Sequence, residues 1–536
     1  MRRHGLFLTS CLVLLALSSC DADISGETFE NLPPETALSV RDNSLVDNLQ
    51  GQDPLASTVA ASWSGTDADG YVVAFEVRAY GDDTTPAPTD GWNRTTRQDS
   101  LILLPIPRGQ RTANVVLEVR AIDNSGLTDP DPARTVFPIQ NAPPTARFST
   151  FSLPPDTTFS IASFGLEADD PEGLANLDRL EIALNDSVNF TAVPADLDFI
   201  TLAGVVDQGN TAQTETTAEV FAGRAFQDLN ISVPGLLLDA ENTLYMRAVD
   251  VTDTTSALVR HTWFVKKPTS RVLYVNDYRK NTTPRITAYH LDLLSEHLGN
   301  DDIDLWDLSL PYGTGSAGNT QRSPALPADA EPMLSQTFAL YDYIYWVSTN
   351  TISNQVTNNL PFAARSMDLF FEEGGKLMVH SPVSVPEDPE DNLGNPAVLL
   401  LPLTDIVSFP DSLRPSLRLP RNTPIALDEP APGVTLPALR AEGIVINTLP
   451  YSTSGANTIS LYRADYEYRT RQGDRGVWFG ASTVASVSAD LRVGLFALPL
   501  INEQNGTPLL VGDDGNPETA RAAVQTMLDL LGFPKG

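Results

Sequence analysis

Four histidines that could bind a transition metal or act as a base lie beyond the first 20 residues: His261, His290, His297 and His380. His290 and His297 are seven residues apart, so one helical face could carry both. Neither has a histidine four residues away, which is the spacing of a zinc-binding helix. Both are more simply surface or half-buried residues of a helix, and the sequence predicts no metal centre. No glycine-rich phosphate loop follows any predicted strand.

The turn Asp67-Ala68-Asp69-Gly70 contains half of a calcium-binding loop. A complete loop of that kind ends in a bidentate glutamate at its twelfth position, and none stands there. The sequence allows two interpretations. Asp67 and Asp69 bind calcium weakly, or the segment forms a tight turn in which Gly70 adopts a positive φ. Apart from this possible calcium ion, the sequence indicates no cofactor.

Short strand-forming runs that alternate with turn residues surround this segment. Between residues 36 and 142 the runs include Thr58–Trp63, Tyr71–Arg78 and Val115–Asp123. Their length and spacing predict a β-sandwich. The prolines of Asn141–Pro144 predict an extended hinge, after which residues 143–268 repeat the pattern. The run Thr243–Thr252 aligns with the Val119–Asp123 segment, so the sequence predicts tandem sandwich modules.

The first module resembles a fibronectin type III or immunoglobulin-like module. The resemblance covers about 100 residues and depends on an early tryptophan, an acidic turn and two later strands. These features are Trp63, Asp67–Gly70, Phe75–Arg78 and Val119–Gly126.

Residues 269–536 show a different pattern, in which apolar strands alternate with helices. Strands are predicted at Arg271–Tyr278, Ile303–Leu308, Tyr341–Val347, Lys376–His380 and Leu491–Leu498. Helices are predicted at Ile286–Leu298, at Phe362–Glu373 and at Glu518–Leu531, the last capped by Gly532. This alternation predicts an α/β domain whose parallel sheet carries helices on both faces, interrupted by a β-rich insertion at about 382–476.

This region resembles the class I glutamine amidotransferase-like, flavodoxin-like fold. The resemblance depends on Val272–Tyr278, Tyr341–Trp346, Phe370–Val379 and Phe496–Leu500. It implies a nucleophilic cysteine on a sharp elbow after Val379, where this chain has His380-Ser381-Pro382 instead. Pro382 removes a backbone N–H that an oxyanion hole would need, and no histidine follows His380. We therefore expect no catalysis.

The carboxyl ends of the predicted parallel strands are nevertheless where open α/β sheets bind ligands. Asp277, Tyr278, Asp307 and Ser348 lie at those ends, and His380 and Ser381 are expected at the same rim. A protein or carbohydrate partner would suit the aromatic residues of this region. The sequence therefore predicts a ligand rim without a catalytic residue.

The amino terminus resembles the lipobox of bacterial lipoproteins. Arg2 and Arg3 precede an apolar run from Leu6 to Leu17, and Leu17-Ser18-Ser19-Cys20 follows. The run is too short to span a bilayer, as in a signal peptide. The resemblance implies cleavage after residue 19 and acylation of Cys20, with residues 20–35 as a tether. The alternative is an ordinary signal peptide in which Cys20 is incidental.

Asp21, next to the acylated cysteine, does not decide which membrane holds the protein. In lipoproteins, an aspartate there accompanies inner-membrane retention in some bacteria, and acidic residues there accompany surface export in others. We expect the outer membrane or cell surface, with the periplasmic face of the inner membrane as the alternative. The formal net charge of -33 excludes nucleic acid as a partner, because phosphates would be repelled. The sequence thus predicts a lipid-anchored cell-envelope protein that binds or scaffolds without catalysis. The alternative is an exported hydrolase or amidotransferase-like enzyme with a rebuilt site.

Overall fold

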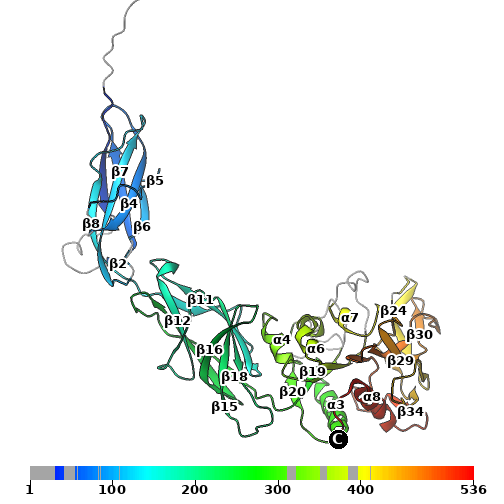
Figure 1. Cartoon of the computed structure of the whole chain (residues 1–536). Helices are drawn as coiled ribbons and strands as arrows, with labels where there is room; N and C mark the ends of the chain where they lie inside the picture. Colours follow the sequence, from blue (N-terminus) through cyan, green and yellow to red (C-terminus); the bar gives the residue numbers. More distant parts are fainter. Residues whose placement is uncertain are drawn as a thin grey trace, which may run out of the picture. The chain divides into compact units, whose positions relative to one another are not determined.

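The computed structural model describes residues 30–40, 55–56, 58–82, 84, 86–104, 106–107, 109–310, 322–349, 359–383, 396–407, 409–410 and 412–536. The chain is mostly β and divides into two compact units. The first comprises Met1–Pro143 with Pro171–Asn176, and the second comprises Pro144–Asp170 with Leu177–Gly536. Figure 1 shows the order of the elements. Cys20 and the predicted signal segment lie outside the described residues.

The first module is a sandwich of two sheets, which confirms the β-sandwich prediction for this part of the chain. The sheets have the strand orders β1-β3-β6 and β2-β8-β7-β4-β5. Trp63 and Phe75 meet edge to face in the core between them, with ring centroids 6.4 Å apart. The strands are β1 Glu35–Val40, β2 Leu55–Ala56, β3 Thr58–Thr66, β4 Val72–Gly81, β5 Asn93–Thr95, β6 Asp99–Leu103, β7 Thr112–Asp123 and β8 Ala133–Gln140.

The second module is also a sandwich, with the strand orders β10-β18-β17-β12-β13 and β16-β15-β14-β11-β9. Phe164 and Trp263 meet edge to face in its core, at 5.1 Å. The strands are β9 Thr145–Phe148, β10 Thr157–Thr158, β11 Ile161–Asp169, β12 Leu177–Leu184, β13 Thr191–Pro194, β14 Phe199–Gly204, β15 Glu215–Ala222, β16 Gln227–Leu237, β17 Ala240–Asp250 and β18 Val259–Val265, with the short helix η1 Leu174–Asn176.

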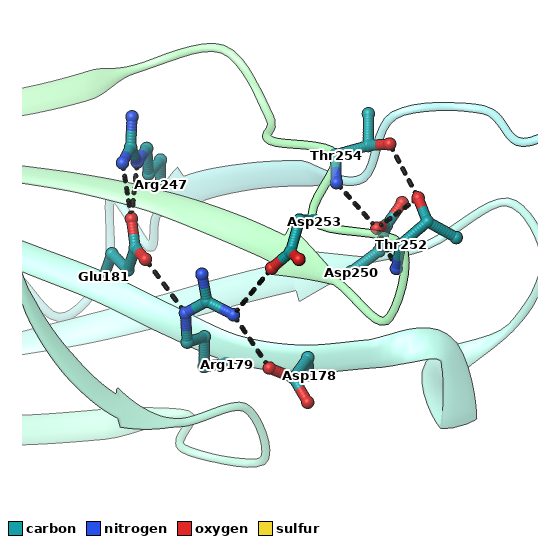
Figure 2. A network of polar contacts seen from close by, with 8 residues as sticks. All are labelled: Asp178, Arg179, Glu181, Arg247, Asp250, Thr252, Asp253 and Thr254. Atoms are coloured by element: carbon teal, nitrogen blue, oxygen red, sulfur yellow. Dashed lines mark hydrogen bonds and ion pairs between the residues drawn. The ribbon is translucent and has the colours of Figure 1, made fainter. Parts of the chain in front are cut away.

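The two modules share a cross-strand ion pair at equivalent positions. Glu76 on β4 faces Arg120 on β7 at 2.7 Å, and Glu181 on β12 faces Arg247 on β17 at 2.6 Å. Figure 2 shows the pair of the second module, extended by Arg179, which also binds Glu181 at 2.9 Å. Opposite charges directly across an antiparallel pair stabilise the register of the two strands.

A buried aspartate ends the strand after each of these arginines. In the first module, Oδ1 of Asp123 accepts the backbone N–H groups of Ser125 and Leu127, both at 2.8 Å. In the second, Oδ1 of Asp250 accepts those of Thr252 and Thr254, at 2.7 and 2.9 Å (Figure 2). Arg120 and Asp123 match Arg247 and Asp250 in spacing, so the aspartate turn repeats together with the strands that the sequence aligns.

The rest of the second unit is built on one twelve-stranded sheet. Five of its strands run parallel in the order β20-β19-β21-β22-β33. They are β19 Val272–Asp277, β20 Asp304–Asp307, β21 Tyr343–Ser348, β22 Lys376–His380 and β33 Val493–Phe496. β19 is buried along its whole length, as expected of a strand with both faces covered. The parallel strands occupy the predicted positions.

Helices pack against these parallel strands from two sides. In Figure 1, α3 Thr283–Leu298 and α8 Glu518–Leu531 lie on one side of them, and α4 Met333–Phe338 and α6 Asp368–Glu372 on the other. Gly532 caps α8 with a φ of 83°, as predicted. The single helix predicted over Phe362–Glu373 is wrong, because this region is divided into α5 Asn359–Ala363, the 3-10 turn η3 Ala364–Ser366, and α6.

Between β22 and β33 the chain is β-rich. After α7 Pro396–Leu400, some of its strands extend the large sheet in antiparallel fashion, and β27-β24-β30-β31 form a separate sheet. β34 Leu510–Gly512 follows β33 and pairs with β26. The remaining strands are β23 Asp405–Ile406, β24 Leu413–Leu419, β25 Pro424–Leu427, β26 Leu439–Ala441, β27 Val445–Ile446, β28 Tyr451–Ser452, β29 Thr458–Ala464, β30 Glu467–Thr470, β31 Arg475–Val477 and β32 Thr483–Ser488.

Within the second unit, the second sandwich packs against the α/β region. Phe159 of the sandwich lies edge to face with Trp306 and Tyr341, at centroid distances of 5.9 and 5.6 Å. The connecting segment carries a buried lysine, Lys267, whose ammonium donates to the carbonyl of Gln213 at 2.9 Å. The sequence places a module boundary at Lys266–Thr269, where proteolytic cleavage is expected if the linker is exposed. Lys267 and Pro268 of this segment are buried.

Candidate functional site

A cavity of about 310 Å³ opens at the carboxyl edge of the parallel sheet. Three of the rim residues predicted from the sequence line it: Tyr278 follows β19, Ser348 ends β21 and His380 ends β22. Parallel strands bring these residues together because all of their carboxyl ends meet at one edge. The remaining lining residues are Lys280, Ile286, His290, Val347, Thr349, Pro382, Ile444, Val445, Ile446, Asn447, Pro499, Leu500, Ile501, Asn502, Glu503, Gln504 and Leu509.

Two buried histidines meet in the wall of this cavity. The rings of His290, from α3, and His380 lie edge to face with centroids 4.4 Å apart. Nδ1 of His290 lies 2.9 Å from the hydroxyl of Tyr345, and the ring of His380 stacks on Phe496. The prediction that His290 and His297 are surface or half-buried residues is wrong, because they are only 3% and 4% exposed.

Burial keeps both cavity histidines neutral. Desolvation lowers the pKa of His380 to about 3, and the nearby backbone of Leu498 acts in the opposite direction. Desolvation holds the pKa of His290 well below its ordinary value, helped by electrostatic coupling to His380 and by the positive charge of Arg521. The pair therefore presents uncharged imidazoles to the cavity at neutral pH.

An ion pair and a phenol form the polar side of the cavity. The Lys280 ammonium lies 3.0 Å from Oε2 of Glu503, which also accepts the hydroxyl of Tyr278. Burial and the adjacent Glu503 raise the pKa of Tyr278, so its hydroxyl stays protonated and donates. The lysine and glutamate charges cancel, and this wall adds no net charge to the cavity.

Asp277, also predicted at the rim, does not line the cavity. Its carboxylate is buried and accepts hydrogen bonds from Nδ2 of Asn359 at 2.6 Å and from Nε1 of Trp346 at 3.3 Å. Burial raises the pKa of Asp277 to about 7, although the Asn359 hydrogen bond and the charge of Arg279 lower it. The aspartate joins the end of β19 to α5 and β21 rather than facing a ligand.

Ser381 and Asp307 also lie outside the cavity lining. Ser381 is fully buried, and its hydroxyl donates to the carbonyl of Pro382 at 3.3 Å while its backbone N–H binds the carbonyl of Phe496 at 3.1 Å. Asp307 is exposed and accepts hydrogen bonds from Asn276 and from the backbone of Ser309, both at 3.0 Å. The structure therefore brings only Tyr278, Ser348 and His380 of the predicted rim together.

Sequence reasoning missed His290 and Glu503 as cavity residues. His290 follows Ile286 by four residues and precedes Leu294 by four, so it lies on the apolar face of α3, and that spacing was a usable signal. Glu503 has no such signal, because its place depends on the loop after β33 returning to β19, some 225 residues earlier in the chain.

The acidic turn of the first module contains both predicted calcium-binding residues. The backbone N–H of Asp69 lies 3.5 Å from Oδ1 of Asp67, and Oδ2 of Asp69 accepts the N–H of Leu32 at 3.1 Å. Gly70 does not adopt the expected positive φ. A Cβ there would lie 2.2 Å from Oδ1 of Asn124 and 2.5 Å from Oδ2 of Asp67, so any larger residue would have to displace these two side chains.

In the part of the chain that the structure describes, no group of three or more histidine, cysteine, aspartate or glutamate residues is placed to hold a metal ion. The described helices include none that is long and apolar enough to cross a membrane.

The neutral histidine pair predicts a specific acid sensitivity. The pKa of a histidine is about 6.5 in the unfolded chain, and the pKa of both buried histidines is far lower in the folded chain. Below pH 6.5 the unfolded chain therefore binds protons that the folded chain does not, and the free energy of unfolding falls as the pH falls. Each histidine contributes a slope of up to about 1.4 kcal/mol per pH unit. Replacing His380 by asparagine should flatten the dependence by about that amount between pH 6 and pH 4, measured by urea unfolding.

Asp277 works in the opposite sense, since its raised pKa makes the folded state lose stability as pH rises from about 4 to about 7. The His380→Asn variant retains Asp277, so the difference between variant and wild type isolates the histidine. Parallel stability curves for the two proteins would contradict the assignment of His380 as a neutral buried group.

No protein-family model matches this chain, and no curated protein matches it. Solved structures that match include fibronectin(III)-like modules of Clostridium thermocellum CbhA, at 12% identity and a TM-score of 0.16, covering 43% of this chain and 95% of that one. The FN1–FN3 domains of chicken CNTN1 match at 10% identity and a TM-score of 0.20, covering 45% and 68%. The chicken interferon gamma receptor alpha chain matches at 12% identity and a TM-score of 0.20, covering 44% and 98%. At such low TM-scores, the description of the sandwiches rests on their own strand pairing.

Proposed function

We propose that this chain is a lipid-anchored protein of the bacterial cell envelope that binds a small ligand without transforming it. The cavity at the carboxyl edge of the parallel sheet carries this proposal, since it combines apolar walls with a few convergent polar groups. Acylated Cys20 is the anchor, and the outer membrane or the cell surface is the favoured location. The two sandwich modules act as spacers and as surfaces for a protein or carbohydrate partner.

The proposal includes a fold assignment for each part of the chain. Numbered along the chain, the five parallel strands have the order 2-1-3-4-5, which is the order of flavodoxin-like sheets. This order supports the resemblance to the amidotransferase-like fold. The repeated Glu–Arg pair and buried aspartate support two modules of one fibronectin type III or immunoglobulin-like kind.

The environment of Ser381 supports the absence of nucleophilic catalysis. A serine nucleophile needs an exposed hydroxyl within hydrogen-bond reach of a base. The Ser381 hydroxyl is buried and donates to the neighbouring carbonyl of Pro382, and its own backbone N–H binds Phe496, so that N–H is not available to an oxyanion. His380 directs its ring at His290 and Phe496.

Ligand retention tests the proposal. Purified protein is incubated with a small-molecule extract of the producing cells, washed, and analysed by mass spectrometry. Ile446, at the cavity mouth, is 57% exposed, so Ile446→Trp should narrow the cavity without disturbing the core. We expect wild type to retain a compound that Ile446→Trp loses by at least about tenfold, which corresponds to about 1.4 kcal/mol.

Val477→Trp is the matched control, because Val477 is 52% exposed on the same small sheet and does not line the cavity. It should retain the compound like wild type. Equal retention by all three proteins would contradict binding in the cavity. Conversion of the compound during incubation, abolished by Ser381→Ala, would support the enzymatic alternative instead.

A further inference from the structure

The small sheet β27-β24-β30-β31 has one face in the core and one face in solvent. Leu417, Leu419 and Val445 lie on the core face and are buried. Residues directly opposite one another on antiparallel strands share a face, so the register arranges the solvent-facing residues in two rows. The first row is Ile446, Arg418, Glu467 and Val477, and the second is Arg469 and Arg475. We call this surface the arginine face.

Two arginines of this face oppose each other. Arg469 on β30 lies directly opposite Arg475 on β31, and like charges in this position destabilise an antiparallel pair. Glu467 lies 3.9 Å from Arg475, but its Oε2 also accepts the Nε–H of Arg418 at 2.7 Å. The side chain of Arg469 makes no ion pair or hydrogen bond with the described residues. The face therefore carries positive charge that no carboxylate of the described chain neutralises.

This positive charge contrasts with the rest of the chain. The whole sequence has 68 acidic residues and 35 lysines and arginines, whereas β24, β30, β31 and the turn from β30 to β31 together contain five arginines and two acidic residues. The net negative charge is enough to keep the chain soluble, so solubility does not require these arginines. Salt screens charges that lie more than about 8 Å away, so the local charge of the face governs what binds there at short range.

The kind of cation and the apolar residues beside it indicate the class of partner. No lysine occurs between Lys376 and Lys535, so every cation of the face is a guanidinium, which binds carboxylates with two hydrogen bonds. Val477 is 52% exposed, and Phe479, two residues later, is 92% exposed. Arginine and aromatic residues are enriched in protein–protein interfaces and lysine is depleted. This composition favours a protein that carries carboxylates.

We propose that the arginine face docks an acidic segment of a partner protein. Carboxylates of that segment bind Arg469 and Arg475 and relieve the repulsion between them. Apolar side chains of the segment cover Val477 and Phe479. The arginines do not line the cavity, so this interaction goes beyond the proposed ligand binding and does not depend on it.

A fluorescent peptide of three glutamate–serine–leucine–serine repeats tests the proposal, titrated with the full chain at neutral pH and low salt by fluorescence anisotropy. In an extended peptide this spacing places glutamate and leucine on one side. We expect binding at least about tenfold tighter than that of the same peptide with glutamine in place of glutamate. Arg469→Gln combined with Arg475→Gln should weaken binding by at least about tenfold, because charged hydrogen bonds are lost. This variant should unfold at the same or a higher urea concentration than wild type, because the opposed charges are removed.

Arg463→Gln combined with Arg492→Gln is the control, since it removes the same charge from two exposed arginines that lie outside the arginine face. It should bind the peptide like wild type. Equal weakening in the two double variants would overturn the face as the site, and earlier unfolding of the Arg469 and Arg475 variant would assign these residues a structural role instead. Equal affinity for the two peptides, or no binding of either, would overturn the acidic partner. Sedimentation of wild type, but not of the Arg469 and Arg475 variant, with phosphatidylglycerol vesicles in place of peptide binding would make the face a lipid-binding surface and contradict the proposal.

Discussion

Replacing Cys20 by serine is expected to release the protein from the membrane completely. Acyl chains on the first residue of the mature protein would provide the anchor, and each buried methylene contributes about 0.8 kcal/mol. Cys11 is the only other cysteine in the chain, and it lies in the apolar run of the predicted signal. Fractionation of the producing cells should place wild type with the membranes and Cys20→Ser in the soluble fraction.

Cys11→Ser provides the control for this experiment. Cys11 lies in the segment that processing would remove, so this variant should be anchored like wild type, and the intact mass of both mature proteins should begin at an acylated Cys20. An unmodified amino terminus at Asp21, an uncut Met1, or a membrane-bound Cys20→Ser protein would contradict the lipoprotein assignment.

Replacing Phe159 by alanine is expected to destabilise the second unit by about 3–5 kcal/mol, the usual cost of deleting a buried phenylalanine. Phe159 is 4% exposed and joins the second sandwich to Trp306 and Tyr341 of the α/β region. Loss of this contact should also expose the buried connection around Lys267. Urea unfolding should show the loss of stability, and limited proteolysis should show new cleavage at Lys266–Thr269.

Phe151→Ala is the matched control, because Phe151 belongs to the same sandwich but is 86% exposed. Its unfolding curve and cleavage pattern should follow wild type. If Phe159→Ala unfolds like Phe151→Ala and remains resistant at Lys266–Thr269, the two parts of the unit do not stabilise each other through this contact.

Periodicity predicted the regular elements well where burial is strong. The runs that became β19, β21 and β22 have apolar, buried centres, so their strand character follows from local sequence. The stretch after Leu360 looks like one helix because its apolar spacing continues through Met367, yet the chain turns at η3 and places Phe370 in the core. Tertiary packing causes this turn, and the spacing of apolar residues along the sequence does not predict it.

The candidate site was predictable only in part. Open α/β sheets bind ligands at the carboxyl ends of their parallel strands, and this rule identified Tyr278, Ser348 and His380 from the predicted strand ends. The rule could not tell which end residues face the cavity, and Asp277 and Ser381 are buried away from it. His290 and Glu503 come from a helix and a distant loop, so their approach to His380 and Tyr278 depends on packing.

A crystal structure of the protein with its retained ligand tests the central claim, binding without nucleophilic chemistry, most directly. The account predicts an unmodified ligand in the cavity beside His380 and Tyr278, with the Ser381 hydroxyl still donating to the carbonyl of Pro382. A ligand joined covalently to Ser381, or a Ser381 hydroxyl turned into the cavity and hydrogen-bonded to His380, would contradict it.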